Sequence, residues 1–129
     1  MDLTGDGHVH TEWSFDVGLG DPHSHAAGRM DSMCRRAAQS GLPALAFTEH
    51  LDVTSWAIEP GDLPDRLRPR ISEDGIFAPP LLEAEGYLDS VERCRREFPE
   101  LHILTGVEFG QPHLDEARAR EVIDLDSLD

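Results

Sequence analysis

Lysine is absent from this 129-residue sequence, and its eleven basic residues, all arginine, face 26 acidic ones. The formal net charge of -15 at pH 7 leaves no basic face broad enough to neutralise many phosphates of a nucleic-acid backbone. A general nucleic-acid binder is therefore disfavoured. The same acidity would repel an anionic small molecule unless bound metal ions placed positive charge in the site.

Cysteine and long hydrophobic runs are also scarce. Cys34 and Cys94 are the only cysteines, and each lies in a helix-like apolar pattern, so neither a disulfide framework nor a CxxC site is indicated. We expect both to be small core residues. The N-terminus lacks a basic stretch followed by an apolar run, and no window approaches 18 uninterrupted apolar residues. These absences predict a cytoplasmic protein with no membrane partner.

The segments that are present alternate between strand-like and helix-like patterns. Strands are expected at residues 6–11, 42–47 and 101–109, the second as a continuous apolar run typical of a strand buried on both faces. Helices are expected from Met30 to a stop at Gly41, over residues 87–98, and from near Pro112 through Ile123. This order predicts one α/β domain with right-handed crossovers and a parallel sheet.

Residues 51–80 break the alternation. Prolines recur there without a sustained hydrophobic period, so we predict one long loop with room for a helical turn. Three parallel strands would leave the outer edges of the sheet unpaired. We therefore expect the chain to be the N-terminal part of a larger barrel, and the purified chain to self-associate or to show molten behaviour.

Polar residues of the type that binds metals stand where the predicted strands end. His8 and His10 are two residues apart, so an extended strand points both imidazoles to one side, an arrangement that suits a divalent transition metal. Asp16 lies just beyond this pair, His50 follows the second strand, and Glu108 lies near the end of the third. Such ends collect on one face of a parallel α/β fold, where active sites are built.

Three segments carry a family resemblance: Asp-Gly-His-Val-His-Thr-Glu-Trp-Ser-Phe-Asp (residues 6–16), Ala-Phe-Thr-Glu-His (46–50) and Thr-Gly-Val-Glu (105–108). In order and spacing they resemble the first three motifs of the polymerase and histidinol phosphatase (PHP) family, and the resemblance covers nearly the whole chain. Members of that family have a distorted seven-stranded (β/α) barrel that holds two or three divalent ions. The resemblance implies that residues 1–129 are a partial PHP domain of about three βα units, with the loop 51–80 inside it.

The resemblance also implies a ligand set. His8 and His10 would bind a first ion, Glu108 would bridge two ions and take part in catalysis, and Asp16 with His50 would hold a third. The ions would be zinc, manganese or iron. They would offset the repulsion of an anionic substrate and generate a hydroxide nucleophile near neutral pH. A serine or cysteine nucleophile paired with a histidine is neither required nor indicated.

Two functions are open at this point. The resemblance implies a metal-dependent phosphoesterase that hydrolyses a small phosphomonoester; histidinol phosphate is one candidate, because the Thr-Glu-His and Gly-Val-Glu motifs resemble the histidinol phosphatase branch. The alternative is a non-catalytic, truncated PHP domain that acts as a metal-binding or protein-interaction module. It arises because the family supplies further histidine ligands and an Asp-x-His motif from later strands, and this sequence stops before any of those strands, so the chain by itself could be inactive.

Several further residues have two interpretations each. The dense basic cluster of Arg66, Arg68 and Arg70 could grip a phosphate, but solvated charges paired with neighbouring acids are favoured. His23 and His25 repeat the His-x-His spacing in a Gly- and Pro-rich loop, where a role as auxiliary ligands is the less favoured interpretation.

Three more candidates lie next to predicted elements. His113 could reach the site or could simply open the third helix. Asp6 could accept a hydrogen bond from a ligating imidazole or could be a turn residue. Glu49 should point opposite to His50 on an extended strand, which favours a supporting or structural role.

Overall fold

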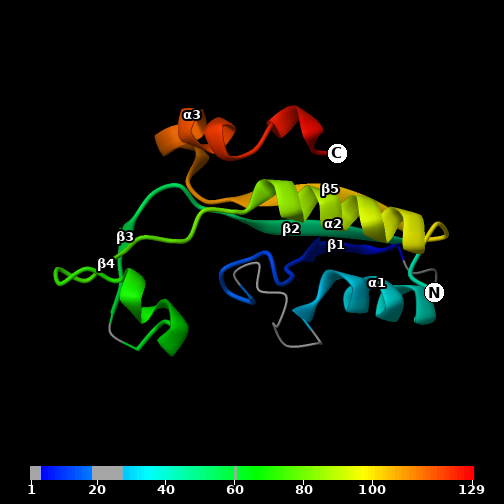
Figure 1. Cartoon of the computed structure of the whole chain (residues 1–129), viewed down its shortest axis with the longest axis horizontal. Coiled ribbons are helices and arrows are strands. Elements are labelled where there is room, and N and C mark those ends of the chain that lie inside the picture. Colours follow the sequence, from blue (N-terminus) through cyan, green and yellow to red (C-terminus); the bar gives the residue numbers. More distant parts are fainter. Residues whose placement is uncertain (1–3, 19–27, 60) are drawn as a thin grey trace.

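The structure is a computed structural model that describes residues 4–18, 28–59 and 61–129. Six elements follow the predicted order (Figure 1): β1 (Asp6–Val9), α1 (Met30–Gln39), β2 (Ala44–Leu51), α2 (Ala84–Glu97), β5 (His102–Phe109) and α3 (Pro112–Val122). Two short strands that were not predicted, β3 (Trp56–Ala57) and β4 (Ile76–Phe77), lie in the segment expected to be a loop. A parallel three-stranded sheet has the order β1-β2-β5. The predicted α/β class with parallel strands is confirmed, and it is consistent with part of a PHP-type barrel.

The strand register sets the positions of the polar ends. β2 and β5 pair residue for residue from Ala44 beside His102 to Leu51 beside Phe109. The prediction that the second strand ends at residue 47 is therefore wrong, because pairing with β5 continues past it and places His50 beside Glu108. β1 in turn ends at Val9 instead of residue 11, and the Thr11 amide donates to the Glu49 side chain (2.9 Å) instead of to a strand.

The hydrophobic core lies on one face of the sheet. Along β2, buried residues alternate with half-buried ones, so only every second side chain faces the core. The expectation that this strand is buried on both faces is wrong within the described residues. Residues of α1, α2, β2 and β5 share the core, and the Tyr87 hydroxyl of α2 lies 3.2 Å from the carbonyl oxygen of Phe47 and 2.7 Å from that of Gly106. The helix is thus fixed to two neighbouring strands.

The end of α1 confirms the predicted stop. Gly41 has φ 73°, and its amide donates to the carbonyl of Ala38 while the amide of Leu42 donates to that of Ala37. This pair of bonds is the Schellman arrangement, in which a residue in the left-handed region satisfies the last carbonyls of a helix. Glycine is favoured there because it has no Cβ to strain.

Both cysteines are fully buried in the core between α1 and α2, as predicted. Replacing Cys34 by Ala should lower the free energy of unfolding by on the order of 1–2 kcal/mol, because it truncates a buried side chain and leaves a small cavity. Urea denaturation followed by circular dichroism would measure this. A loss of secondary structure at zero denaturant would contradict a purely packing role for Cys34.

The outer edges of the sheet differ from each other. In the part of the chain that the structure describes, β1 has no strand on its outer side. The outer side of β5 is partly capped, because the Asp129 amide donates to the Thr105 carbonyl (2.9 Å) and the Thr105 amide donates to the Asp129 carboxylate (2.8 Å). Self-association through open edges stays a prediction.

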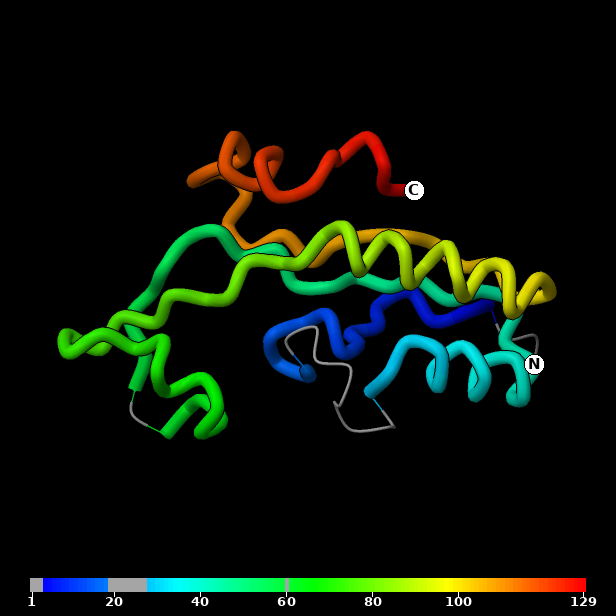
Figure 2. The backbone as a smooth tube through the Cα atoms, viewed as in Figure 1, coloured from blue at the N-terminus to red at the C-terminus, as the bar shows by residue number. Residues whose placement is uncertain are grey.

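Between β2 and α2 the chain leaves the body of the molecule, and we call residues 53–80 the excursion. Figure 2 shows it projecting beyond the end of the sheet at which β2 ends. The expected loop is in fact ordered: β3 pairs antiparallel with β4, a 3₁₀ helix spans Asp65–Arg70, and Leu67 and Phe77 form a small second core with Phe15. Sequence analysis did not predict these short elements, because prolines interrupt their hydrophobic pattern.

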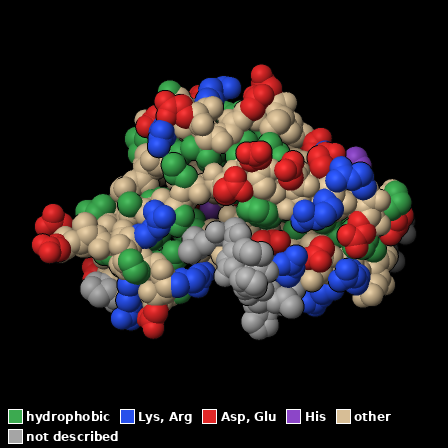
Figure 3. All heavy atoms as spheres, viewed as in Figure 1, with side chains coloured by type: hydrophobic (Ala, Val, Ile, Leu, Met, Phe, Trp, Pro, Cys, Tyr) green, Lys and Arg blue, Asp and Glu red, His purple; other side chains and the backbone are tan. Residues whose placement is uncertain are grey.

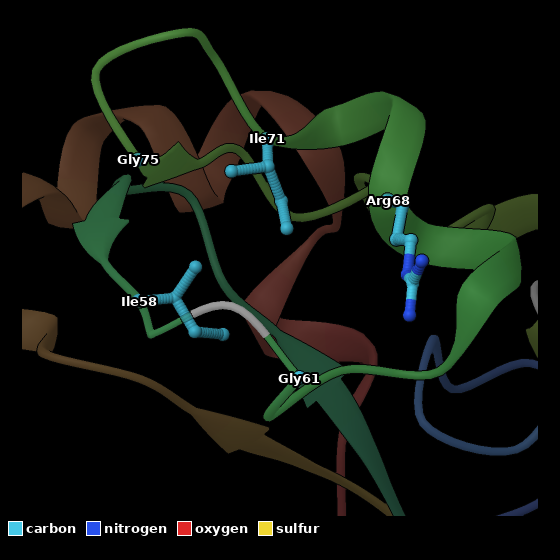
Figure 4. Close-up of a pocket in the computed structure, with 5 residues that line it drawn as sticks. All are labelled: Ile58, Gly61, Arg68, Ile71 and Gly75. Carbon is cyan, nitrogen blue, oxygen red and sulfur yellow. The ribbon is translucent and has the colours of Figure 1, made fainter.

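A pocket of about 460 Å³ lies within the excursion. Ile58 and Ile71 extend into it, Arg68 stands at its side, and Gly61 and Gly75 complete the lining (Figure 4). None of the predicted metal-binding residues contributes to this pocket.

On the face shown in Figure 3, arginine side chains are interspersed with acidic ones over α1 and α2. Among the described residues, no helix combines the length and the apolar character that a membrane crossing requires.

Candidate metal centre

Five polar side chains converge where β1, β2 and β5 end: those of His8, His10, Asp16, His50 and Glu108. Glu108 is at the middle of the group. Its Oε2 lies 3.4 Å from His8 Nε2, 2.8 Å from His10 Nε2 and 3.7 Å from His50 Nε2. One carboxylate oxygen therefore faces three imidazoles from two different strands and the loop after β1.

Asp16 closes the other side of the cluster. Its Oδ2 lies 2.9 Å from His10 Nδ1 and 3.6 Å from His50 Nε2. Two overlapping sets result, one of His8, His10 and Glu108 and one of His10, Asp16 and His50, and within each set the potential ligand atoms lie within 4.8 Å of one another. Ions that bind these atoms at about 2.0–2.2 Å fit such spacings.

His10 provides the best test of whether a cation fits. Its Nε2 is buried and has no hydrogen-bond partner among the described residues, although Glu108 Oε2 lies 2.8 Å away. Its Nδ1 can hydrogen-bond to Asp16 only if that nitrogen carries the proton, so in the neutral ring Nε2 presents a lone pair to a carboxylate. A cation between them, either a second proton or a divalent ion, removes this repulsion. The donor set of imidazoles and carboxylates suits zinc, manganese or iron.

Glu49 supports the cluster from behind, as predicted from its alternation with His50. The side chain is fully buried, and its carboxylate accepts hydrogen bonds from the Thr11 amide (2.9 Å), the Thr11 hydroxyl (2.6 Å) and the Ser14 hydroxyl (2.6 Å). Ser14 Oγ in turn accepts from the His50 amide (3.0 Å). Burial raises the pKa of Glu49, although the hydrogen bonds from Ser14 and Thr11 oppose that shift. This network fixes the loop after β1 against the end of β2.

Asp52 is a supporting residue that the sequence analysis missed. Its Oδ2 lies 2.9 Å from His50 Nδ1, and this contact raises the pKa of His50 while burial opposes it. With Nδ1 held by Asp52, His50 Nε2 is directed toward Asp16 and Glu108. Gly110 packs so closely on Asp52 that a Cβ there would overlap its carboxylate. An acid two residues after a candidate ligand was the only signal available.

Replacing Asp52 by Asn should weaken metal binding by about 10–100-fold, because an amide is a poorer acceptor for the imidazole proton and leaves the ring less well oriented. Calorimetric titration of metal-free protein with Mn²⁺ would measure this. The matched control is Asp74→Asn, a change at an exposed turn residue of the excursion. Equal affinities for the two variants would contradict the role assigned to Asp52.

Other candidates lie outside the cluster. Asp6 is the first residue of β1, and its carboxylate accepts from the backbone amide of His8 (3.2 Å). Its interpretation as a turn residue is therefore wrong, and within the described residues no imidazole donates to it. His113 is exposed in the first turn of α3 and belongs to neither set. His23 and His25 lie outside the described residues.

Two arginines of the basic cluster, Arg68 and Arg66, have different kinds of partner in the structure. Arg68 pairs with Asp65 (2.9 Å) at an exposed position, as expected of a solvated loop charge. The expectation that Arg66 pairs with neighbouring acids is wrong: its Nη2 donates to the backbone carbonyls of Phe15 (3.1 Å) and Asp16 (2.8 Å). Carbonyls some fifty residues away along the sequence cannot be identified as partners from spacing alone.

Comparison with known proteins agrees with this geometry. The family model of the PHP domain matches residues 6–127, a range that includes all five clustered side chains. No curated protein and no solved structure matches the chain significantly. The cluster of metal-binding residue types and the parallel α/β fold are both consistent with this family match, which covers most of the chain. The chain belongs to the PHP domain family, a family of metal-dependent phosphoesterases.

Proposed function

We propose that the cluster binds divalent metal ions and that the protein hydrolyses a small phosphomonoester. The observation that carries the proposal is the environment of His10, where both ring nitrogens face carboxylates and the buried Nε2 lacks a hydrogen bond. Bound positive charge stabilises an arrangement in which carboxylates face the nitrogens of a neutral imidazole.

The proposal assigns each of the five clustered residues a role in metal binding. His8, His10 and Glu108 hold one ion, and Asp16 and His50 hold another beside it, with Glu108 Oε2 within reach of both sets. Divalent ions bound there supply positive charge for a phosphate and lower the pKa of water enough to provide a nucleophile near neutral pH. Glu108 is 43% exposed, so a substrate can approach it from solvent.

The surroundings favour water over a protein nucleophile. Cys34 and Cys94 are buried in the core between the helices. The Ser14 hydroxyl donates its proton to Glu49 and accepts a hydrogen bond from the His50 amide, so it is not free to act as a nucleophile. A direct, single-displacement hydrolysis fits this arrangement better than a covalent intermediate.

The proposed substrate is more specific than the activity that family membership indicates. Histidinol phosphate is the first compound to test, because the Thr-Glu-His and Gly-Val-Glu motifs of β2 and β5 resemble the histidinol phosphatase branch. Manganese, zinc and iron are the ions proposed. A phosphomonoester suits the site because its dianion gains most from a cationic cluster in an otherwise acidic protein.

The test separates binding from chemistry. Chelated, metal-free protein is reloaded with Mn²⁺ or Zn²⁺, the bound metal is measured, and phosphate release is followed with a generic monoester and with histidinol phosphate. The proposal expects metal binding and metal-dependent release. Full metal occupancy without hydrolysis of any monoester would favour a metal-binding module instead, and absence of bound metal would overturn the proposal.

A further inference from the structure

Among the described arginines, only Arg66 donates from the excursion to backbone carbonyls of the loop after β1, and one of these carbonyls belongs to Asp16, a proposed metal ligand. One nitrogen, Nη2, is shared between the carbonyls of Phe15 and Asp16. The Asp16 carboxylate, on the same residue, faces His10 and His50. A bond to the backbone of a ligand residue restricts where its side chain can point.

Ring packing supports the same connection. Phe15 lies between the two parts, with ring centroids 4.6 Å from His50 and 5.8 Å from Phe77 of β4. Leu67, the neighbour of Arg66 in the 3₁₀ helix, is buried in the same small core. The excursion therefore contacts both members of the Asp16–His50 pair, directly at Asp16 and through Phe15 at His50.

The other set is supported differently. His8 lies in β1 and His10 directly after it, and Glu108 lies in β5. Both strands are held in place by pairing with β2. Hydrogen bonds within a sheet do not depend on the excursion. Loss of the Arg66 contact should accordingly weaken the Asp16 side of the cluster more than the Glu108 side, which shares only His10 with it.

We propose that Arg66 is a positioning residue through which the excursion holds Asp16 in place, so that it controls occupancy of the His10–Asp16–His50 set more strongly than that of the His8–His10–Glu108 set. This inference rests on the proposed metal centre and adds a role for a segment outside it. Arg66 itself touches no proposed ligand atom; it acts through the backbone of Asp16.

Arg66 is exposed, so its substitution disturbs no core packing. Arg66→Met keeps the length of the side chain and removes its donors. Arg66→Lys keeps a charged donor that can reach two carbonyls. Arg68→Met is the matched control, since it removes a guanidinium from the same 3₁₀ helix that pairs only with the exposed Asp65 in the described structure.

The experiment titrates each metal-free variant with Mn²⁺ by calorimetry. The unsubstituted protein and Arg68→Met should show two classes of site. Arg66→Met should weaken one class by about 10–100-fold, the usual effect of losing a group that orients a ligand, and Arg66→Lys should recover part of it. In a His8→Ala background, which removes the Glu108-side class, Arg66→Met should then weaken the class that is left.

The outcomes are distinguishable. Unchanged affinities in Arg66→Met, or equal weakening of both classes, would overturn the role of Arg66 while leaving the metal centre intact. Absence of metal binding by the unsubstituted protein would overturn both. Circular dichroism of the metal-free variants checks that each is folded as the unsubstituted protein is.

Discussion

Replacing Glu108 by Gln is expected to reduce metal-dependent phosphate release by at least about 100-fold, because a shared carboxylate that stabilises two cations is worth several kcal/mol. Its Oε2 faces His8, His10 and His50 at 3.4, 2.8 and 3.7 Å. A neutral amide has almost the same shape, but it lacks the charge and is a poor ligand for these ions. The same substitution should lower the amount of bound metal.

The measurement is the rate of phosphate release from a generic monoester, with bound metal determined in parallel. Glu116→Gln is the matched control, because Glu116 is an exposed residue of α3 that pairs with Arg120 at 2.8 Å, outside the cluster. A Glu108→Gln protein with undiminished turnover and metal content would show that this carboxylate is not a ligand.

Replacing Glu49 by Ala should cost at least about 3 kcal/mol of stability, because buried donors that lose their acceptor cost roughly 1–3 kcal/mol each. The Thr11 amide and hydroxyl and the Ser14 hydroxyl all donate to this carboxylate, and Thr11 and Ser14 are fully buried. The loop that carries Asp16 would also lose its attachment to β2, so metal affinity should fall as well.

Glu49→Gln should cost less, since its carbonyl can still accept from two of the donors and its amide has nearly the same volume. Denaturation of the metal-free proteins isolates the effect on stability from that on metal binding. If Glu49→Ala unfolded at the same urea concentration as the unsubstituted protein, the buried network would not contribute to stability.

The parts of the site that lie on strands could be predicted from the sequence. His8, His10, His50 and Glu108 stand at strand ends, and the parallel register brings such ends together. Asp16 is on a loop, and it was placed by resemblance to a family motif; the structure brings it to 2.9 Å from His10.

The supporting residues could not be predicted in the same way. Arg66 contacts backbone carbonyls, and backbone acceptors have no signature in a sequence. Asp52 acts through a side-chain contact that depends on how the chain turns after β2. Strand boundaries were missed for a related reason: β2 extends to Leu51 because its partner β5 continues, and pairing is a property of two segments and not of one.

The most direct measurement is a crystal structure of the protein loaded with Mn²⁺ or Zn²⁺, with the ions located by anomalous scattering. The account predicts anomalous peaks within about 2.0–2.3 Å of ligand atoms from both sets, one among His8, His10 and Glu108 and one beside Asp16 and His50. Peaks only at other residues, such as His113, or no peaks at saturating metal, would contradict it.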